Sequence, residues 1–244
     1  MISRLTKLVV TAAATLLIAP IVAEAADQPI PRYKAPLRSV MAYYNWTGFY
    51  VGVVGGYASG KADWDITAGG VTTTSSMSPK GWLFGGTIGY NFQAGSLVYG
   101  IEADYSFASV KGSTPDCFGA IGATCEVSHN SLATVRGRIG YAFDRWLPYF
   151  TAGLAYAPIK TSISTAALTT DATKGRMGWT AGVGIEYALF GNWSVKAEYL
   201  HVDLGSESSG INFGAGVTDT LKFSEDIIRV GLNYRFSGPI FSRY

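Results

Sequence analysis

The strongest constraint on this chain is a strict alternation of apolar residues with polar or small ones, and it is clearest near the end of the sequence. In residues 229–236, alternate positions are apolar or aromatic, and the positions between them are polar or glycine. A period of two places these two sets on opposite faces of a β-strand. No helical segment is available to cover the apolar face. A closed barrel with that face in lipid fits the pattern.

The same alternation predicts eight strands, at 46–57, 81–92, 97–107, 134–143, 150–156, 179–187, 193–200 and 229–236. Their connections alternate between long segments and tight turns. We expect long loops at 61–80, 111–130, 161–176 and 204–223, and turns at Ala94-Gly95, Asp144-Arg145 and Gly191-Asn192. Long loops on one side and short turns on the other are typical of outer-membrane barrels. The predicted fold is therefore all-β, an eight-stranded antiparallel up-and-down transmembrane β-barrel with both termini on the short-turn, periplasmic side.

The composition agrees with a surface that faces lipid. Only 15% of the residues are charged, against about 25% in a typical globular protein, while 14% are aromatic. The formal net charge is +2, which gives no indication of a nucleic-acid partner.

The first 25 residues read as a cleavable secretory signal. Arg4 and Lys7 precede an apolar run at 8–19, and Ala23-Glu24-Ala25 has the small-x-small form of a cleavage site. The run is shorter than the roughly 20 residues that a membrane helix needs. We expect a signal peptide at 1–25, a Pro-rich periplasmic linker at 26–45, the barrel at 46–236 and a tail at 237–244.

Two cysteines, Cys117 and Cys125, enclose a short segment rich in Gly and Ala. In an exported chain this spacing favours a disulfide, and two free thiols are the alternative. Closing so short a loop contributes roughly 2–3 kcal/mol in the chain-entropy model. A metal site is disfavoured, because His129 alone leaves the coordination incomplete.

Residues 45–50, the Gly-Tyr pairs 89–90 and 140–141, and the closing strand resemble the opacity-type porin family. These are small outer-membrane barrels abundant in Gram-negative alphaproteobacteria, and the likeness covers 46–236. The resemblance implies a location in the cell outer membrane, contact with its lipid and lipopolysaccharide, and recognition by the barrel-assembly machinery. The assembly signal would be Arg229, Gly231, Tyr234 and Phe236. Many members end at the final aromatic residue, whereas this chain continues through 237–244.

Strand parity points a set of charged side chains into the barrel. The set is Glu102, Asp104, Arg136, Arg138, Glu186, Lys196, Glu198, Arg229 and Arg235. An eight-stranded barrel is just wide enough inside for side chains to fill it, so we expect these charges to pair and form a plug. Reflection through the connecting loop pairs Asp104 with Arg136 and Glu102 with Arg138. A charged, water-filled pore is the alternative.

The sequence therefore predicts a structural envelope barrel with surface loops, and the family resemblance implies porin-like behaviour, with at most narrow conductance through the filled lumen. The resemblance also implies the alternative, a surface receptor or adhesin, for example one that binds a haem compound or contacts a host through its loops. In those loops, candidate anchors are Trp64, Ile66, Phe118, Ile211 and Phe213. No extracellular ligand is indicated.

We do not predict an enzyme, and no catalytic, cofactor or metal residue is assigned. His201 and Asp203 are reminiscent of the rims of lipid-modifying barrels. Parity, however, sends His201 to the lipid-facing side, and no serine nucleophile is fixed beside it.

Overall fold

The structure is a computed structural model that describes residues 44–236. The predicted signal peptide (1–25), most of the predicted linker (26–43) and the tail (237–244) lie outside the described residues.

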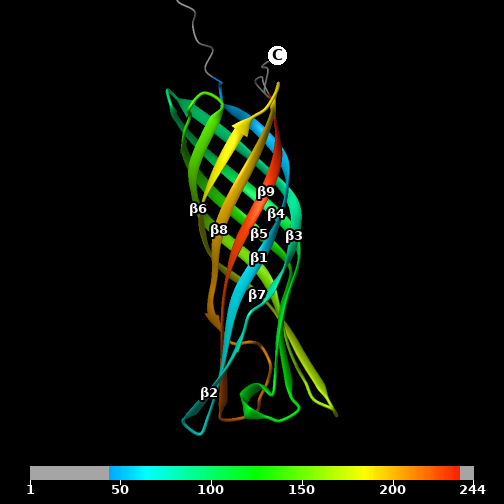
Figure 1. Cartoon of the computed structure of the whole chain (residues 1–244). Helices are drawn as coiled ribbons and strands as arrows, with labels where there is room; N and C mark the ends of the chain where they lie inside the picture. The colour runs from blue at the N-terminus through cyan, green and yellow to red at the C-terminus, as the bar shows by residue number, and fades with distance from the viewer. Residues whose placement is uncertain (1–43, 237–244) are drawn as a thin grey trace, which may run out of the picture. The chain divides into compact units, whose positions relative to one another are not determined.

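The described residues form an antiparallel β-barrel (Figure 1). Each strand pairs with its neighbours in chain order, and β9 returns to pair with β1 over nineteen residue positions, so the ring is closed. Closure gives every edge a partner, which is the condition for a sheet to cross a bilayer. The strands are β1 (Gly48–Ala68), β2 (Val71–Met77), β3 (Lys80–Ala94), β4 (Leu97–Pro115), β5 (Thr124–Tyr141), β6 (Trp146–Ser164), β7 (Thr169–Ala188), β8 (Trp193–Glu207) and β9 (Val217–Arg235).

The ring has eight positions, as predicted, although nine strands are counted among the described residues. β2 pairs with residues 62–68 of β1, and β3 pairs with residues 48–59 of the same strand. The two strands therefore follow one another along a single position of the ring, separated at Ser78-Pro79.

The prediction of four long loops was wrong in extent, because most of those residues continue the strands. The connections at this end of the barrel are only 69–70, 116–123, 165–168 and 208–216. These segments are rich in Thr and Ser, so they lack the apolar alternation that we used, although Thr is a residue enriched in strands. Gly69 and Gly70 have φ of 59° and 82°, which allows the tight turn between β1 and β2. We call the end of the barrel that carries the connections 69–70, 116–123, 165–168 and 208–216 the hairpin end. The opposite end, which carries the predicted tight turns, is the turn end.

Outward-facing apolar residues form a belt around the barrel, and their parity is as predicted. On β6 the exposed side chains Trp146, Phe150, Leu154 and Tyr156 are followed by Lys160. On β4 the belt runs from Leu97 to Phe107 before Lys111. About 9–11 residues of tilted strand cross a bilayer, so the belt has the required height. Within residues 44–236, no helix is long and apolar enough to span a membrane.

The barrel interior is arranged in three layers. A small apolar cluster lies at the turn end and includes Trp46, Val98 and Leu147. A larger apolar core fills the hairpin end and includes Trp64, Ile159 and Phe223. Charged side chains from five strands occupy the layer between them.

Candidate functional site

The charged layer of the lumen is the most distinctive feature of the structure. It contains four carboxylates and four cations, none more than 5% exposed: Glu102, Asp104, Glu186, Glu198, Arg136, Arg138, Lys196 and Arg229. An isolated buried charge is costly, so charges in this position need partners. Inside this layer the formal charges balance, four against four.

Two arginines and two carboxylates form a closed ring of ion pairs across the lumen. Arg136 contacts Glu198 (Nη1–Oε1 2.9 Å) and Asp104 (Nη2–Oδ2 3.0 Å). Arg229 contacts the other oxygen of each, with Nε–Oε2 of 2.6 Å to Glu198 and Nη1–Oδ1 of 2.9 Å to Asp104. Every carboxylate oxygen in this ring therefore accepts from a guanidinium. Arginine suits such a site because its planar fork matches carboxylates two bonds at a time.

The remaining four charges form a chain beside this ring. Lys196 Nζ lies 2.8 Å from Glu102 Oε2, and Arg138 Nη2 lies 2.7 Å from Glu186 Oε2. Arg138 also approaches Glu102, at 3.6 Å. The side-chain amide of Asn233 donates to Glu186 over 2.9 Å. The chain and the ring meet at Glu102, which also pairs with Arg136.

Two buried tyrosines complete the network, and our sequence interpretation did not include them. The hydroxyl of Tyr50 donates to Glu102 over 2.7 Å, and that of Tyr149 donates to Glu198 over 3.1 Å. The Arg138 guanidinium lies 4.3 Å from the centre of the Tyr149 ring, at cation–π distance. Both tyrosines occupy inward positions of their strands, so parity was the available signal.

The predicted contacts of Asp104 with Arg136 and of Glu102 with Arg138 both occur, but the predicted register was wrong. Along the backbone, Glu102 lies opposite Arg136, and Asp104 lies opposite Thr134. The register of β4 and β5 shifts between Phe107 and Val110, which reflection through the loop did not anticipate. Arg136 and Arg138 nevertheless reach more than one carboxylate each, so both predicted contacts form despite the different register.

Arg235 was expected in the network but lies outside it. Its guanidinium sits 4.5 Å from the centre of the Tyr44 ring and donates to the backbone oxygen of Thr47. Among the described residues it makes no ion pair with a carboxylate. Arg235 is the last residue of β9, at the turn end of the barrel.

A separate polar contact lies within the hairpin-end core, and sequence reasoning missed it. His129 Nε2 is 3.0 Å from Glu225 Oε2, and both side chains are buried. The two residues are 96 positions apart, and neither belongs to a recognisable motif. Arg176 is also buried there, and donates to the backbone oxygens of Leu221 and Glu207.

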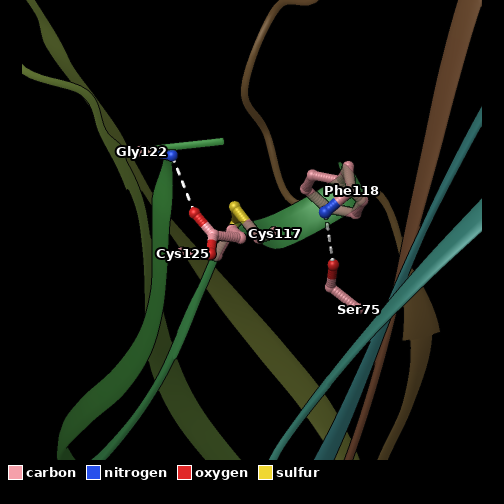
Figure 2. The surroundings of a disulfide bond; sticks show 6 residues. Ser75, Cys117, Phe118, Gly122 and Cys125 are labelled. Carbon is pink, nitrogen blue, oxygen red and sulfur yellow. Dashed lines mark hydrogen bonds between the residues drawn. A yellow bond between two sulfur atoms is a disulfide. The ribbon is translucent and has the colours of Figure 1, made fainter. Parts of the chain in front are cut away.

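The predicted disulfide is present and ties down the connection between β4 and β5 (Figure 2). Cys117 opens the 3-10 turn η1 (Cys117–Gly119), and its Cα lies 5.8 Å from that of Cys125. The amide of Phe118 donates to the hydroxyl of Ser75 on β2 over 2.8 Å. The Phe118 ring packs edge-on against Trp64, 5.4 Å between centres, so this connection folds over the lumen.

The other predicted anchors and the outward histidine are also placed. Phe213 contacts Trp64, Ile211 is buried in the same core, and Ile66 is half-buried on β1. His201 faces outward and pairs with Asp226 (Nδ1–Oδ1 2.8 Å) rather than with Asp203.

The residues of the expected assembly signal divide between the two faces of β9. Arg229 and Gly231 are buried on the lumen side. The backbone amide of Phe236 donates to the carbonyl of Phe49 over 2.8 Å, and its ring stacks near those of Phe49 and Tyr234. Phe236 therefore also seals the junction between the last strand and the first.

Comparison with known proteins agrees with this geometry. Residues 13–236 match the family model described as outer membrane protein beta-barrel domain. The chain is 34% identical to a 31 kDa outer-membrane immunogenic protein of Brucella melitensis, covering 88% of this chain and 93% of that protein. It is also 34% identical to a 25 kDa outer-membrane immunogenic protein of Brucella abortus, covering 96% and 100%.

Among solved structures, the outer membrane protein OprG of Pseudomonas aeruginosa is similar, with a TM-score of 0.46 and 15% identity over 80% of this chain and 98% of that one. The family match spans the whole described barrel and the two Brucella relatives cover most of the chain. This chain therefore belongs to the outer membrane protein beta-barrel domain family.

Proposed function

We propose that this outer-membrane protein is a structural barrel of the envelope whose lumen is sealed, and which displays hairpins at the cell surface. The observation that carries the proposal is the ring formed by Arg136, Glu198, Arg229 and Asp104, which spans the lumen through direct contacts. Eight-stranded barrels have room inside for side chains and little else.

The layers on either side support a sealed barrel. Toward the turn end, Trp46 and Leu147 are buried in the apolar cluster. Toward the hairpin end, Trp64 belongs to the larger apolar core and Phe118 packs against it. A hydrated ion would have to separate paired charges and cross both apolar layers, and each step is costly.

Single-channel recording in planar bilayers tests this proposal. We expect the wild-type barrel to show low or intermittent conductance. Arg136→Ala removes one member of the ring and two of its four ion pairs, so we expect it to raise cation leakage and lower thermal stability. Arg145→Ala is the matched control, because Arg145 is exposed at a turn and donates to the backbone oxygen of Leu189. A large, steady conductance in wild type that Arg136→Ala leaves unchanged would show an open lumen.

A second candidate function is surface recognition, in line with the immunogenic outer-membrane relatives. The structure places an exposed aliphatic side chain near the tip of three hairpins: Val71, Ile121 and Leu168. Side chains of this kind, isolated in polar hairpins, suit contact with a ligand or a host surface. Replacing all three with Ser, followed by titration of intact cells with a haem compound and with antibodies, tests this. Unchanged binding of both would exclude the tips as the contact.

A further inference from the structure

We propose that the outer face of β4–β7 carries a binding site for the phosphate group of an outer-leaflet glycolipid, with a groove below it for an acyl chain. The site lies where the apolar belt gives way to the polar hairpins. The location of this site in the outer membrane follows from membership of the family, and the proposal does not depend on the sealed lumen.

The head of the site is a pocket of about 210 Å³ between β4, β5, β6 and β7. It is lined by hydroxyl, amide and ammonium donors: Ser109, Lys111, Ser128, Asn130, Lys160 and Thr173, besides apolar residues and His129. A water molecule occupies about 30 Å³ in the liquid, so the pocket has room for several water molecules or for one phosphate group in their place.

Two β-bulges open this pocket. The β4–β5 register shifts between Phe107 and Val110, and the β5–β6 register shifts between His129 and Ala133. Both irregularities flank Asn130, which is exposed. Bulges are concentrated at barrel rims and beside binding sites, where they re-aim side chains.

The charges around the pocket favour an anion. Lys80 lies directly opposite Lys111, Lys111 opposite Ser128, and Ser128 opposite Lys160, so these residues form one row across four strands. Like charges directly opposite one another are destabilising unless something neutralises them. Lys160 pairs with Asp171 at 3.1 Å, but within residues 44–236 Lys80 and Lys111 make no ion pair with a carboxylate. A phosphate between the strands supplies the missing counter-charge.

A shallow apolar groove lies below the pocket on the same strands. Gly137, Ala152 and Ala181 lie side by side in register, and form its floor. Tyr99 and Phe150 stand along its edge. Ala152 is eight residues from Lys160 along β6, about 26 Å of strand, so the pocket is at the edge of the belt and the groove near its middle. This spacing matches a lipid with its phosphate at the surface and its acyl chain in the hydrocarbon.

Titration of the purified full-length protein in zwitterionic nanodiscs tests the proposal. The probes are lipid A, which carries two phosphates, its dephosphorylated form, and inorganic phosphate, with bound lipid counted by native mass spectrometry. Lys111→Gln with Lys160→Gln is expected to weaken lipid A binding about tenfold or more, and added salt to weaken it further in wild type. Lys61→Gln with Lys222→Gln is the matched control, because these lysines are exposed beyond the pocket and the charge change is the same.

The proposal predicts that the affinity for lipid A changes less than about twofold in the control variant, Lys61→Gln with Lys222→Gln. It predicts full lipid A binding in Lys111→Arg with Lys160→Arg, which keeps both positive charges. Equal binding of dephosphorylated lipid, or equal loss in the control pair, would overturn it. Displacement of the lipid by millimolar inorganic phosphate would show a site for free anions and overturn the lipid assignment. Because these lysines are outside the lumen, single-channel conductance of the same variants reports separately on the sealed barrel.

Discussion

Arg229 of the last strand and Asp104 of β4 form a two-point ion pair although they are 125 positions apart in the sequence. Nη1 lies 2.9 Å from Oδ1, and Nη2 lies 3.2 Å from Oδ2. The pair joins two strands that are not neighbours in the ring, and it does so through the lumen, without the hydrogen bonds between neighbouring strands.

Removing this arginine should destabilise the barrel strongly. Arg229→Ala leaves Asp104 and Glu198 each with one guanidinium fewer in a buried layer, which we expect to cost about 3–5 kcal/mol. Urea unfolding, followed by the gel shift between folded and boiled protein, measures the change. Arg235→Ala serves as the control, since within residues 44–236 the Arg235 guanidinium contacts the Tyr44 ring and makes one long hydrogen bond to the backbone oxygen of Thr47, and about 1 kcal/mol or less is expected. An equal loss of unfolding free energy in both variants would show that the ion-pair ring contributes no more to stability than the contacts of Arg235.

Gly153 should tolerate no side chain. It lies directly opposite Arg136, and a Cβ there would overlap the carbonyl oxygen of Val135 and lie 2.6 Å from the Cα of Arg136. Gly153→Ala is therefore expected to cost about 1–3 kcal/mol through displacement of β5. At Gly137, on the outer face, the nearest atom to a Cβ is 3.9 Å away, so Gly137→Ala should change stability by less than about 0.5 kcal/mol. Matched thermal melts of the two variants decide the point.

The disulfide should matter to its own connection more than to the barrel. Replacing both Cys117 and Cys125 with Ser removes a bridge that closes a short loop, with an expected cost of about 2–3 kcal/mol at most. The variant should still show the heat-dependent gel shift of a folded barrel. Limited proteolysis should cut residues 116–123 faster than in wild type. Loss of the folded band would show that the bridge is needed for the whole barrel.

Acid should loosen the connection 208–216, which we call the cap of the hairpin end, through Asp219. Partial burial of its carboxylate acts to raise the pKa, but hydrogen bonds from Ser209, Ser208 and Trp64 outweigh it and hold the pKa below its usual value. A lowered pKa in the folded state stabilises the cap above the ordinary Asp pKa of about 3.9, and that stabilisation is lost as the pH falls through the folded value.

Tryptophan fluorescence and proteolysis of residues 208–216, measured from pH 7 to pH 2, test this effect of acid. Wild type should loosen only at the acid end of the range. Asp219→Asn should be looser at neutral pH and should lose that acid step. A step of the same size in the variant would assign the transition to another carboxylate.

Phe236 should act on assembly more than on the finished barrel. It is 41% exposed and contributes one edge bond and ring contacts to the junction of β9 with β1. We expect Phe236→Ala to slow insertion in cells, measured by pulse-labelling and the gel shift, with a small change in the melting of purified barrel. Leu232→Ala on the same outer face is the control. A chain lacking 237–244 should insert normally, and failure to insert would move the signal into the tail.

Much of the fold could be predicted because alternate residues of a strand face different surroundings and therefore differ in polarity. Phe150 and Leu154 face lipid, whereas Glu102 and Arg136 face the lumen. The alternation of apolar and polar residues in the sequence is enough to assign each side chain to one of these two faces. The hairpin extensions escaped prediction because Thr and Ser at 71–76 carry no apolar contrast. Tertiary geometry was the other limit, because a bulge at 107–110 changed the partners of β4, and the His129–Glu225 contact joins residues that no local pattern connects.

The charge balance of the lumen depends on the strand that is synthesised last. Without β9 the buried layer would hold four carboxylates and three cations, a net charge of −1, because Arg229 is the missing cation. A chain that stops short of β9 would therefore present two defects at once, a free sheet edge and an unneutralised acid in its interior. Both defects disfavour transfer into hydrocarbon, so the chain becomes able to insert into the membrane only when β9 is complete.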